Sequence, residues 1–384
     1  MSRLGTETAF EVLNKARALE REGKEIIHLE IGEPDFSTPE NIIDAAVEAL
    51  HQGWTHYGPS AGLPELRQTI AGYISQTRGV KVTSDEVVVV PGGKPVIFFT
   101  ILALVDEGDE VIYPNPGFPI YQSMIDYMGG SAVPIRLRED RDFSLDVDEL
   151  ASLITDHTKL IILNSPHNPT GGVLNRQEIH DIADAIGDRN VMVLSDEIYS
   201  RLIFEGEHFS IMSVPGFKDR TILLDGFSKT YAMTGWRLGY AVWPGKLYEY
   251  ARKLAVNLHS CVNASAQYAG LAALTGPQDE PAKMVAEFDR RRKVVVAGLN
   301  KLPGTSCATP RGAFYAFPNV KRTGWKAKAL ASALLEDAGV ALISGPDFGI
   351  LGEGYVRVSY ANSTENILKA LNRIGEFLTS RKAA

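Results

Sequence analysis

The sequence predicts an α/β protein with a largely parallel sheet and a second, smaller domain near its C-terminal end. Three features lead to this prediction. With 384 residues, the chain is longer than a single hydrophobic core usually serves. Between about residues 85 and 245, short β-branched apolar runs alternate with segments long enough to hold a helix. Beyond about residue 286 the pattern changes to strands grouped around a helix.

Six apolar runs in the first part of the chain are predicted to be strands. They lie at residues 86–91, 109–115, 158–166, 190–197, 220–229 and 237–243. Several have no polar residue in their centre, as in "VVVV" and "LIIL". Continuous apolar runs of this length are typical of strands covered on both faces, as in a parallel sheet flanked by helices.

Residues 38–50, "TPENIIDAAVEAL", predict an amphipathic helix before the first of these strands. Thr38 is a candidate N-cap, and Pro39 suits the first helical turn. The helical spacing places a set of apolar residues on one face: Ile42, Ile43, Ala46, Val47 and Leu50.

A second helix is predicted over residues 94–105, "KPVIFFTILALV", directly after a strand and the pair Gly92 and Gly93. Pro95 suits its first turn. Because the segment is apolar nearly all round, we expect it to be buried.

The C-terminal part predicts strands at residues 311–320, 340–346 and 355–361, a helix at 326–339, and a final helix after Asn362. We therefore expect a large domain over residues 46–285. The small domain is expected to combine residues 1–45 with residues 286–384.

Composition and charge exclude several classes of function. A formal net charge of -8 argues against nucleic acid or an anionic membrane as the main partner. The longest mostly apolar stretch, residues 96–105, is half of the roughly 20 residues that a membrane helix needs. The charged N-terminal stretch lacks the apolar centre of a secretion signal. Cys261 and Cys307 have no metal-ligand spacing, so we expect neither disulfides nor a metal site, and a reducing cytoplasmic location.

Polar residues gather where the predicted strands end. In open α/β sheets, ligands bind just beyond the carboxyl ends of the strands, so these residues are expected to form one site. They are Gly92, Gly93, Lys94, Asn164, Asn168, Asp196, Tyr199, Ser228 and Lys229.

This set of groups suits pyridoxal phosphate. Lys229 can hold the cofactor aldehyde as a Schiff base and then move a proton. An aspartate can keep the ring nitrogen protonated, and a phenol with an amide can hydrogen-bond the ring hydroxyl. The phosphate needs a cation, hydroxyls and backbone N–H groups. The stretch at residues 223–240, "LLDGFSKTYAMTGWRLGY", contains Lys229 together with Ser228 and Arg237 for the phosphate.

The chain resembles the class I aminotransferases, which are fold-type I pyridoxal-phosphate enzymes, over nearly its whole length. The matching stretches are "IGEPDFSTP", "HYGPSAGLPELR", "PGGKP", "NPGFPIY", "NSPHNPTGG", "SDEIYSRL", "GFSKTYAMTGWRLGY", "RGAFYAF" and "YVRVSYA", in the order of the family. The resemblance implies a large domain with a mostly parallel seven-stranded sheet flanked by helices, and a smaller α+β domain.

For the cofactor ring, the resemblance implies that Lys229 forms the Schiff base and transfers the proton. Asp196 would pair with the ring nitrogen, and Tyr199 with Asn168 would hydrogen-bond the ring hydroxyl. Phe118 would stack on the ring. Its neighbour Tyr121 is expected only to pack.

For the phosphate, the resemblance implies contacts from Gly93, Lys94, Ser228 and Arg237. Tyr57 matches a tyrosine that reaches the phosphate of the neighbouring subunit, which implies a homodimer with shared active sites.

For the substrate, Arg357 matches the arginine that grips the α-carboxylate, with help from Gly32 and Asn168. The planar guanidinium can hold a carboxylate through two hydrogen bonds, whereas a lysine offers a point charge.

The expected function is an aminotransferase that moves an amino group from an L-amino acid to a 2-oxo acid, 2-oxoglutarate by family habit, with ping-pong kinetics. Two alternatives stay open: another reaction at the α-carbon, such as β-elimination, and a non-catalytic cofactor-binding protein. The amino-acid donor is not identified. A preference for dicarboxylates would need a second cation, and no residue stands out for that role.

Overall fold

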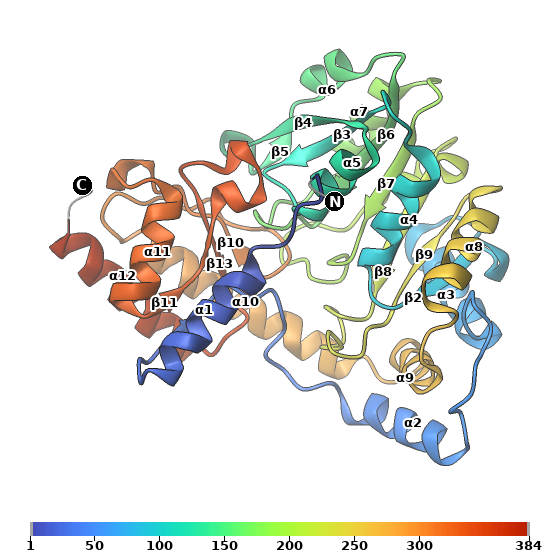
Figure 1. Cartoon of the computed structure of the whole chain (residues 1–384), viewed down its shortest axis with the longest axis horizontal. Coiled ribbons are helices and arrows are strands. Elements are labelled where there is room, and N and C mark those ends of the chain that lie inside the picture. The colour runs from blue at the N-terminus through green and yellow to red at the C-terminus, as the bar shows by residue number, and fades with distance from the viewer. Residues whose placement is uncertain (1–2, 382–384) are drawn as a thin grey trace.

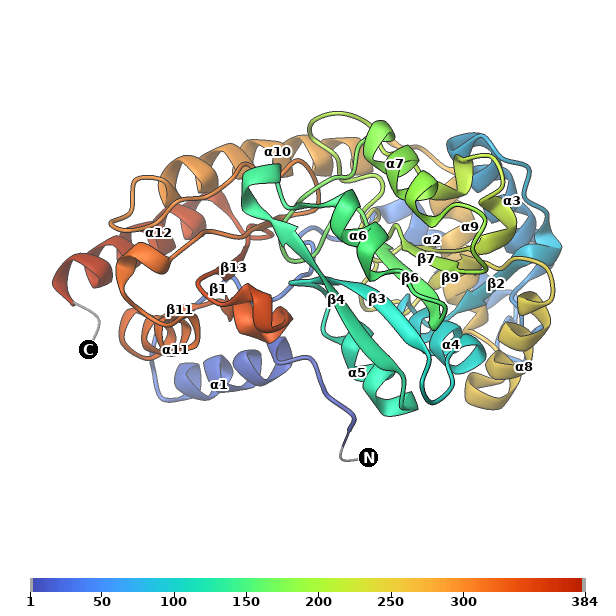
Figure 2. The same ribbon diagram turned by 90° about the horizontal axis from the view of Figure 1, so that it is seen from above.

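The computed structural model describes residues 3–381, and its central feature is an eight-stranded mixed sheet with helices on both faces (Figures 1 and 2). The strands follow the order β2 (Val87–Val90), β9 (Gly239–Val242), β8 (Thr221–Gly226), β7 (Met192–Asp196), β6 (Thr158–Asn164), β3 (Glu110–Asn115), β4 (Ser131–Arg138) and β5 (Ser144–Leu145).

The centre of this sheet is parallel, as predicted. Strands β8, β7, β6, β3 and β4 pair in parallel, while β9 runs antiparallel to both β8 and β2. Each of the six predicted runs forms a strand. The sheet has one strand more than the seven expected when the two-residue β5, antiparallel to β4, is included. A segment this short has no periodicity that sequence reasoning could detect.

The continuous apolar runs are covered on both faces of the sheet. In β2, Val88 and Val90 pack in one hydrophobic cluster, and Val87 and Val89 pack in another on the opposite face. Successive strand residues point to opposite sides, so a strand with a helix layer on each side needs apolar residues at every position.

Eight helices of this part flank the sheet or pack against the helices that do. They are α2 (Glu40–His51), α3 (Pro64–Arg78), α4 (Lys94–Leu104), α5 (Ile120–Met128), α6 (Val147–Leu153), α7 (Arg176–Ile186), α8 (Leu247–His259) and α9 (Ala264–Thr275). Helices α4, α5 and α8 contribute to the cluster on one face, α6 and α7 to a cluster on the other. The apolar helix α4 is largely buried, as expected.

The helix α2 differs from its prediction in two details. Its N-cap position is Pro39, and the Thr38 hydroxyl donates to the carbonyl of Ala232 instead of capping the helix. Its buried positions are Ile42, Ala46 and Ala49. Val47 and Leu50, which were expected on the same face as these, are 46% and 51% exposed. The helix is rotated so that its small alanines pack against the rest of the chain.

The C-terminal elements and the N-terminal segment lie together (Figure 1). They share a hydrophobic cluster that Tyr199 and Leu202 also join. The helices of this part are α1 (Ala9–Arg21), α10 (Asp279–Leu299), α11 (Ala327–Ala338) and α12 (Thr364–Ser380). Strand β1 (Ile27–His28) pairs in parallel with β11 (Val340–Ala341). The strand β13 (Val356–Ser359) lies between β10 (Tyr315–Ala316) and β12 (Ile343–Ser344). The strands and helices predicted for this part are all present.

Candidate active site

A cavity of about 520 Å³ lies at the carboxyl ends of the parallel strands, where the site was expected. Strands β6 and β7 end at Asn164 and Asp196, and both residues line it. Of the site residues predicted from the sequence, all but Gly92 and Tyr57 line this cavity. The predicted residues that line it are Gly32, Gly93, Lys94, Phe118, Asn168, Asp196, Tyr199, Ser228, Lys229, Arg237 and Arg357.

Lys229 follows β8 and extends its ammonium into the cavity, where it donates a 2.5 Å hydrogen bond to the carbonyl of Gly32. Desolvation by the cavity walls lowers the pKa of Lys229 to about 8, although the carboxylates of Glu7 and Glu33 oppose part of this shift. A lysine with such a pKa is partly neutral near neutral pH, and only the neutral amine is a nucleophile or a base.

Asp196 ends β7 and is buried. The Tyr121 hydroxyl donates to its Oδ2 at 2.6 Å, and the backbone N–H of Ile198 donates to its Oδ1 at 3.2 Å. Burial raises the pKa of Asp196 to about 6, and these two donors limit the rise. The carboxylate is therefore mostly ionised at neutral pH and can accept a hydrogen bond from a protonated nitrogen.

Tyr121 is a site residue that sequence reasoning missed. It was expected only to pack, yet its hydroxyl contacts Asp196 from helix α5, 75 positions away in the sequence. The contact depends on how α5 lies against the sheet, so the local stretch "NPGFPIY" contains no signal for it.

A second missed tyrosine, Tyr315, contacts Tyr199 on the cavity wall. Their hydroxyls lie 2.7 Å apart, and burial raises the pKa of Tyr199 well above its usual value. Tyr315 also explains the glycine at position 32. A Cβ there would lie 2.0 Å from the Tyr315 hydroxyl, so only glycine fits beside this ring.

Arg357, on β13, is 3% exposed and lies between the rings of Tyr315 and Phe348, at 4.6 and 4.8 Å from their centroids. One guanidinium nitrogen donates to Asn168 Oδ1 at 3.1 Å, and another donates to the carbonyl of Glu30. Within residues 3–381, its Nε has no acceptor, and the acceptors of its other nitrogens are an amide oxygen and a carbonyl, not a carboxylate. A buried arginine without an anion is costly, so this geometry favours an anionic ligand.

Another part of the cavity wall combines a helix N-terminus with a cation. Gly93 is the N-cap of α4, and Ser228 is buried nearby on the cavity wall. The Arg237 guanidinium lies against Gly92, where an added Cβ would come within 2.2 Å of it. Backbone N–H groups at a helix N-terminus together with an arginine can bind a phosphate.

Three predicted residues are placed in ways that the sequence did not indicate. The Lys94 ammonium pairs with the Glu7 carboxylate at 2.5 Å. The Phe118 ring packs edge-on against Tyr121, with centroids 5.7 Å apart. Tyr57 is 91% exposed and lies outside the cavity lining.

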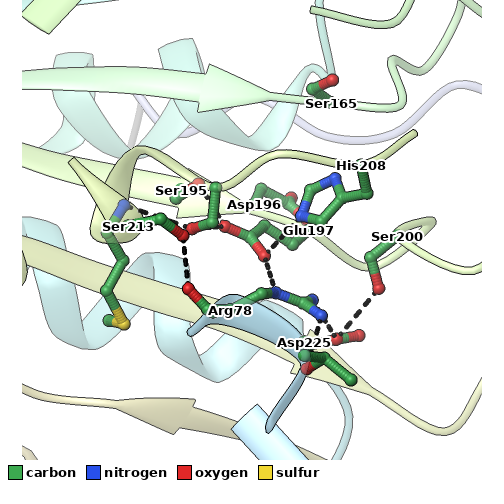
Figure 3. Close-up of polar contacts among 12 residues, drawn as sticks. Arg78, Ser165, Ser195, Asp196, Glu197, Ser200, His208, Ser213 and Asp225 are labelled. Carbon is green, nitrogen blue, oxygen red and sulfur yellow. Dashed lines mark hydrogen bonds and ion pairs between the residues drawn. The ribbon is translucent and has the colours of Figure 1, made fainter. Parts of the chain in front are cut away.

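A buried ion network adjoins Asp196 of the cavity wall through the next residue in the chain, Glu197 (Figure 3). Arg78 joins Glu197, the residue after Asp196, at 2.8 Å and Asp225 of β8 at 3.2 Å. The Glu197 carboxylate also accepts from His208 at 2.7 Å. Burial raises the pKa of Asp225 to about 6, with Arg78 opposing the rise. For Glu197, Arg78 and His208 outweigh burial and hold the pKa well below its usual range.

Serine hydroxyls complete this network, which sequence reasoning did not find. Ser195 and Ser210 donate to Glu197, at 2.8 and 2.5 Å, and Ser200 donates to Asp225 at 3.2 Å. Because the network ties the end of β7 to β8, it holds together the two strands that position Asp196 and Lys229.

None of the helices in the described part of the chain is long and apolar enough to cross a membrane. Among residues 3–381, no cluster of histidine, cysteine, aspartate and glutamate is placed to hold a metal ion.

Comparisons with known proteins agree with this geometry. The family model "Aminotransferase class I and II" matches residues 24–374. An aspartate aminotransferase of Pyrococcus abyssi is 40% identical over 363 residues, which cover 94% of this chain and 93% of that protein.

Two solved structures show the same fold. The alanine aminotransferase of Pyrococcus furiosus aligns with a TM-score of 0.93 and 35% identity, over 98% of both chains. The aromatic aminotransferase of Pyrococcus horikoshii aligns with a TM-score of 0.91 and 39% identity, over 95% of this chain and 99% of that one. These similar proteins are named for different amino donors, namely aspartate, alanine and aromatic amino acids.

Proposed function

Because the chain belongs to the class I and II aminotransferases, we propose that its cavity transfers an amino group from an L-amino acid to a 2-oxo acid with Lys229 as the central catalytic residue. The protein is a pyridoxal-phosphate-dependent transaminase. One observation supports the assignment of the site above all others. Lys229 and Arg357 face one cavity, and neither is paired with a carboxylate in the part of the chain that the structure describes.

The residues present fit pyridoxal phosphate at every group of the cofactor. Lys229 supplies the amine for the aldehyde, and the Asp196 carboxylate suits the ring nitrogen. Tyr199 and Asn168 supply a phenol and an amide for the ring hydroxyl, and Phe118 supplies an aromatic face. When bound, pyridoxal phosphate provides an electron-withdrawing ring that stabilises negative charge at the α-carbon of the amino acid.

The phosphate end has a separate set of donors. We assign to it the N-terminus of α4 at Gly93, the Ser228 hydroxyl and the Arg237 guanidinium. Lys94 was expected to join them. Since its ammonium is engaged with Glu7, we assign its backbone N–H to the phosphate in place of its side chain.

Different residues of the chain bind the substrate and transfer the proton. The Arg357 guanidinium holds the α-carboxylate of the amino acid and, with Asn168 and Gly32 beside it, orients the α C–H bond. The Lys229 amine takes the α-proton and returns a proton later in the same half-reaction. A base with a pKa of about 8 is suited to this work near neutral pH. The acceptor that we propose for the second half-reaction is 2-oxoglutarate.

The test is the visible spectrum of the purified protein before and after addition of a panel of amino acids. A yellow protein that bleaches with an amino acid supports the proposal. Lys229→Ala should abolish bleaching, whereas Lys293→Ala, at an exposed lysine on α10, should leave it unchanged. Equal amounts of oxo acid and new amino acid would indicate transamination. Release of ammonia, or a wild-type protein that never bleaches, would overturn the proposal.

We also propose a homodimer in which Tyr57 reaches the phosphate of the neighbouring subunit. Its 91% exposure, and the exposed Val47, Leu50 and Trp54 nearby in the sequence, support an apolar contact surface in this region. Light scattering of the purified protein tests the assembly. A monomer at micromolar concentration would contradict it.

We also propose that the chain forms two domains and is located in the cytoplasm. The hydrophobic cluster of the C-terminal elements, which Tyr199 and Leu202 also join, supports a small domain made of residues 1–45 and 286–384, beside a large domain of residues 46–285. Residue 286 itself falls inside the continuous helix α10. Cys261 and Cys307 are both free thiols, which supports a reducing, cytoplasmic location.

A further inference from the structure

An ion pair between the N-terminal segment and helix α4 forms part of the cavity wall. Glu7 lies just before α1, and both Glu7 and its partner Lys94 line the cavity. Their charged atoms are 2.5 Å apart, with side-chain exposures of 20% for Glu7 and 41% for Lys94. The segment also contacts α5, where the Ser123 hydroxyl donates to the carbonyl of Gly5 at 3.1 Å.

Lys94 differs from the other cations of this cavity. The cavity is lined by four cationic side chains: Lys94, Lys229, Arg237 and Arg357. Among the described residues, Lys94 is the member of this set that has a carboxylate partner. The other three are already assigned to the amine chemistry, the phosphate and the α-carboxylate. Lys94 is therefore the positive charge that remains for the side chain of a substrate.

Glu7 neutralises that charge. Aromatic rings flank the pair, because the Lys94 ammonium lies 5.5 Å from the ring centroid of Phe10 and 5.7 Å from that of Phe118. With Glu7 in place, the pair carries no net charge and lies beside two aromatic rings. A substrate with a second carboxylate must compete with Glu7 for Lys94, whereas an uncharged side chain can contact the rings with the pair intact.

The electrostatic influence of Glu7 extends into the cavity. Desolvation is the main cause of the lowered pKa of Lys229, and Glu7 is the largest influence that opposes it. The Glu7 carboxylate is thus close enough to act on groups that contact the substrate, and it would repel a second carboxylate there.

We propose that Glu7 is a specificity-determining residue: by occupying Lys94, it biases the cavity toward amino donors with uncharged side chains and against dicarboxylates. This inference rests on the proposed function, which supplies the substrate. A dicarboxylate such as 2-oxoglutarate binds by replacing Glu7 at Lys94. Because the pair is partly exposed, this exchange is feasible, and Glu7 weakens dicarboxylate binding without abolishing it.

The experiment compares two unreactive ligands that differ in one carboxylate. Glutarate has a second carboxylate, and valerate has the same number of carbons with only one. Their dissociation constants are measured by calorimetry on the holoenzyme, for wild type and for Glu7→Gln, which keeps the size of the side chain and removes its charge. We expect Glu7→Gln to tighten glutarate binding about fivefold and to change valerate binding by less than about twofold.

Two further variants make the result specific. Glu11→Gln, an exposed position in the first turn of α1, should leave both ligands unchanged. In a Lys94→Met background, Glu7→Gln should no longer tighten glutarate binding, because the cation that Glu7 competes for is gone. Thermal unfolding and cofactor content are measured for each variant, so that only folded, loaded protein is compared.

The results that would overturn the role of Glu7 differ from those that would overturn the proposed transamination. Glutarate binding that is unchanged in Glu7→Gln, or tightened equally in the Lys94→Met background, would overturn the inference. The calorimetric ratio needs no turnover. A protein whose spectrum never bleaches would refute transamination while the glutarate-to-valerate ratio still tests Glu7.

Discussion

Replacement of Arg78 by methionine is predicted to destabilise the protein through the buried network shown in Figure 3. The Arg78 side chain is 4% exposed and is ion-paired with Glu197 and Asp225, whose side chains are equally buried. Methionine fills similar space but leaves both carboxylates without a guanidinium. Removal of one partner of a buried ion pair costs about 3–5 kcal/mol.

The remaining hydrogen bonds place the expected loss at the lower end of that range. Glu197 keeps His208 and two serine donors, and Asp225 keeps Ser200 and the backbone N–H of Gly226 at 2.7 Å. The carboxylates therefore stay hydrogen-bonded, and the loss comes mainly from the missing positive charge. We expect the free energy of unfolding to fall by about 3 kcal/mol near pH 8.

The loss should depend on pH because of Asp225. Burial raises its pKa in the folded protein to about 6, above its unfolded value. A group of this kind stabilises the fold at low pH, and this contribution is lost as the pH rises through the folded pKa. Arg78 opposes the rise in the pKa of Asp225, so Arg78→Met raises it further. The deficit of the variant should therefore be smaller near pH 5.5 than near pH 8.

The measurement is urea unfolding followed by far-ultraviolet circular dichroism at both pH values, with linear extrapolation to water. The control is Arg252→Met, at an exposed arginine of α8 that pairs with Glu249 at 2.8 Å, where a loss below about 1 kcal/mol is expected. An Arg78→Met deficit no larger than that of Arg252→Met, or one that does not change with pH, would refute this reasoning.

Three further predictions concern the cavity. The rate at which the apoprotein takes up pyridoxal phosphate should rise with pH and level off above about 8, the pKa of Lys229, because only the neutral amine reacts. The rate is followed by absorbance, and a rate that does not change between about pH 7 and pH 9 would contradict this prediction. Tyr121→Phe removes the 2.6 Å hydrogen bond to Asp196, so the pKa of Asp196 should rise and the affinity for the cofactor should fall about tenfold. Spectrophotometric titration measures this affinity, and Tyr250→Phe, at an exposed tyrosine, should leave it unchanged. Arg357→Lys should retain the yellow colour but raise the amino-acid concentration for half-maximal bleaching about 10- to 100-fold, and an unchanged value would remove Arg357 from the carboxylate site.

The strands and most of the candidate site could be predicted from the sequence because both leave local signals. An unbroken run such as "VVVV" is required by a strand that is covered on both faces, and it appears in β2 with its four residues fully buried. The same holds for residues at the ends of strands. Asp196 ends one such strand and Lys229 lies shortly after another. The rule that ligands bind at the carboxyl ends of strands therefore predicts that the two residues share a site, and both line the cavity.

Helix boundaries and helix faces were less predictable. Thr38 has the chemistry of an N-cap, yet its hydroxyl donates a hydrogen bond to the carbonyl of Ala232, which is distant in the sequence. Val47 and Leu50 have the spacing of a buried face but are exposed. Tertiary packing decides the rotation of a helix, because α2 can approach its neighbour α9 more closely through Ala46 and Ala49 than through larger side chains.

The sequence by itself determined which residues have the chemistry for transamination and in what order the strands and helices occur, since periodicity and motifs are properties of neighbouring residues. Only the tertiary structure decided which of those residues meet. The bond from Tyr121 to Asp196, the pairing of Glu7 with Lys94, and the bridge from Arg78 to Glu197 each join segments 75 or more positions apart. Such contacts form because burial forces polar groups to find partners wherever the fold brings them together, and no local pattern specifies that partner.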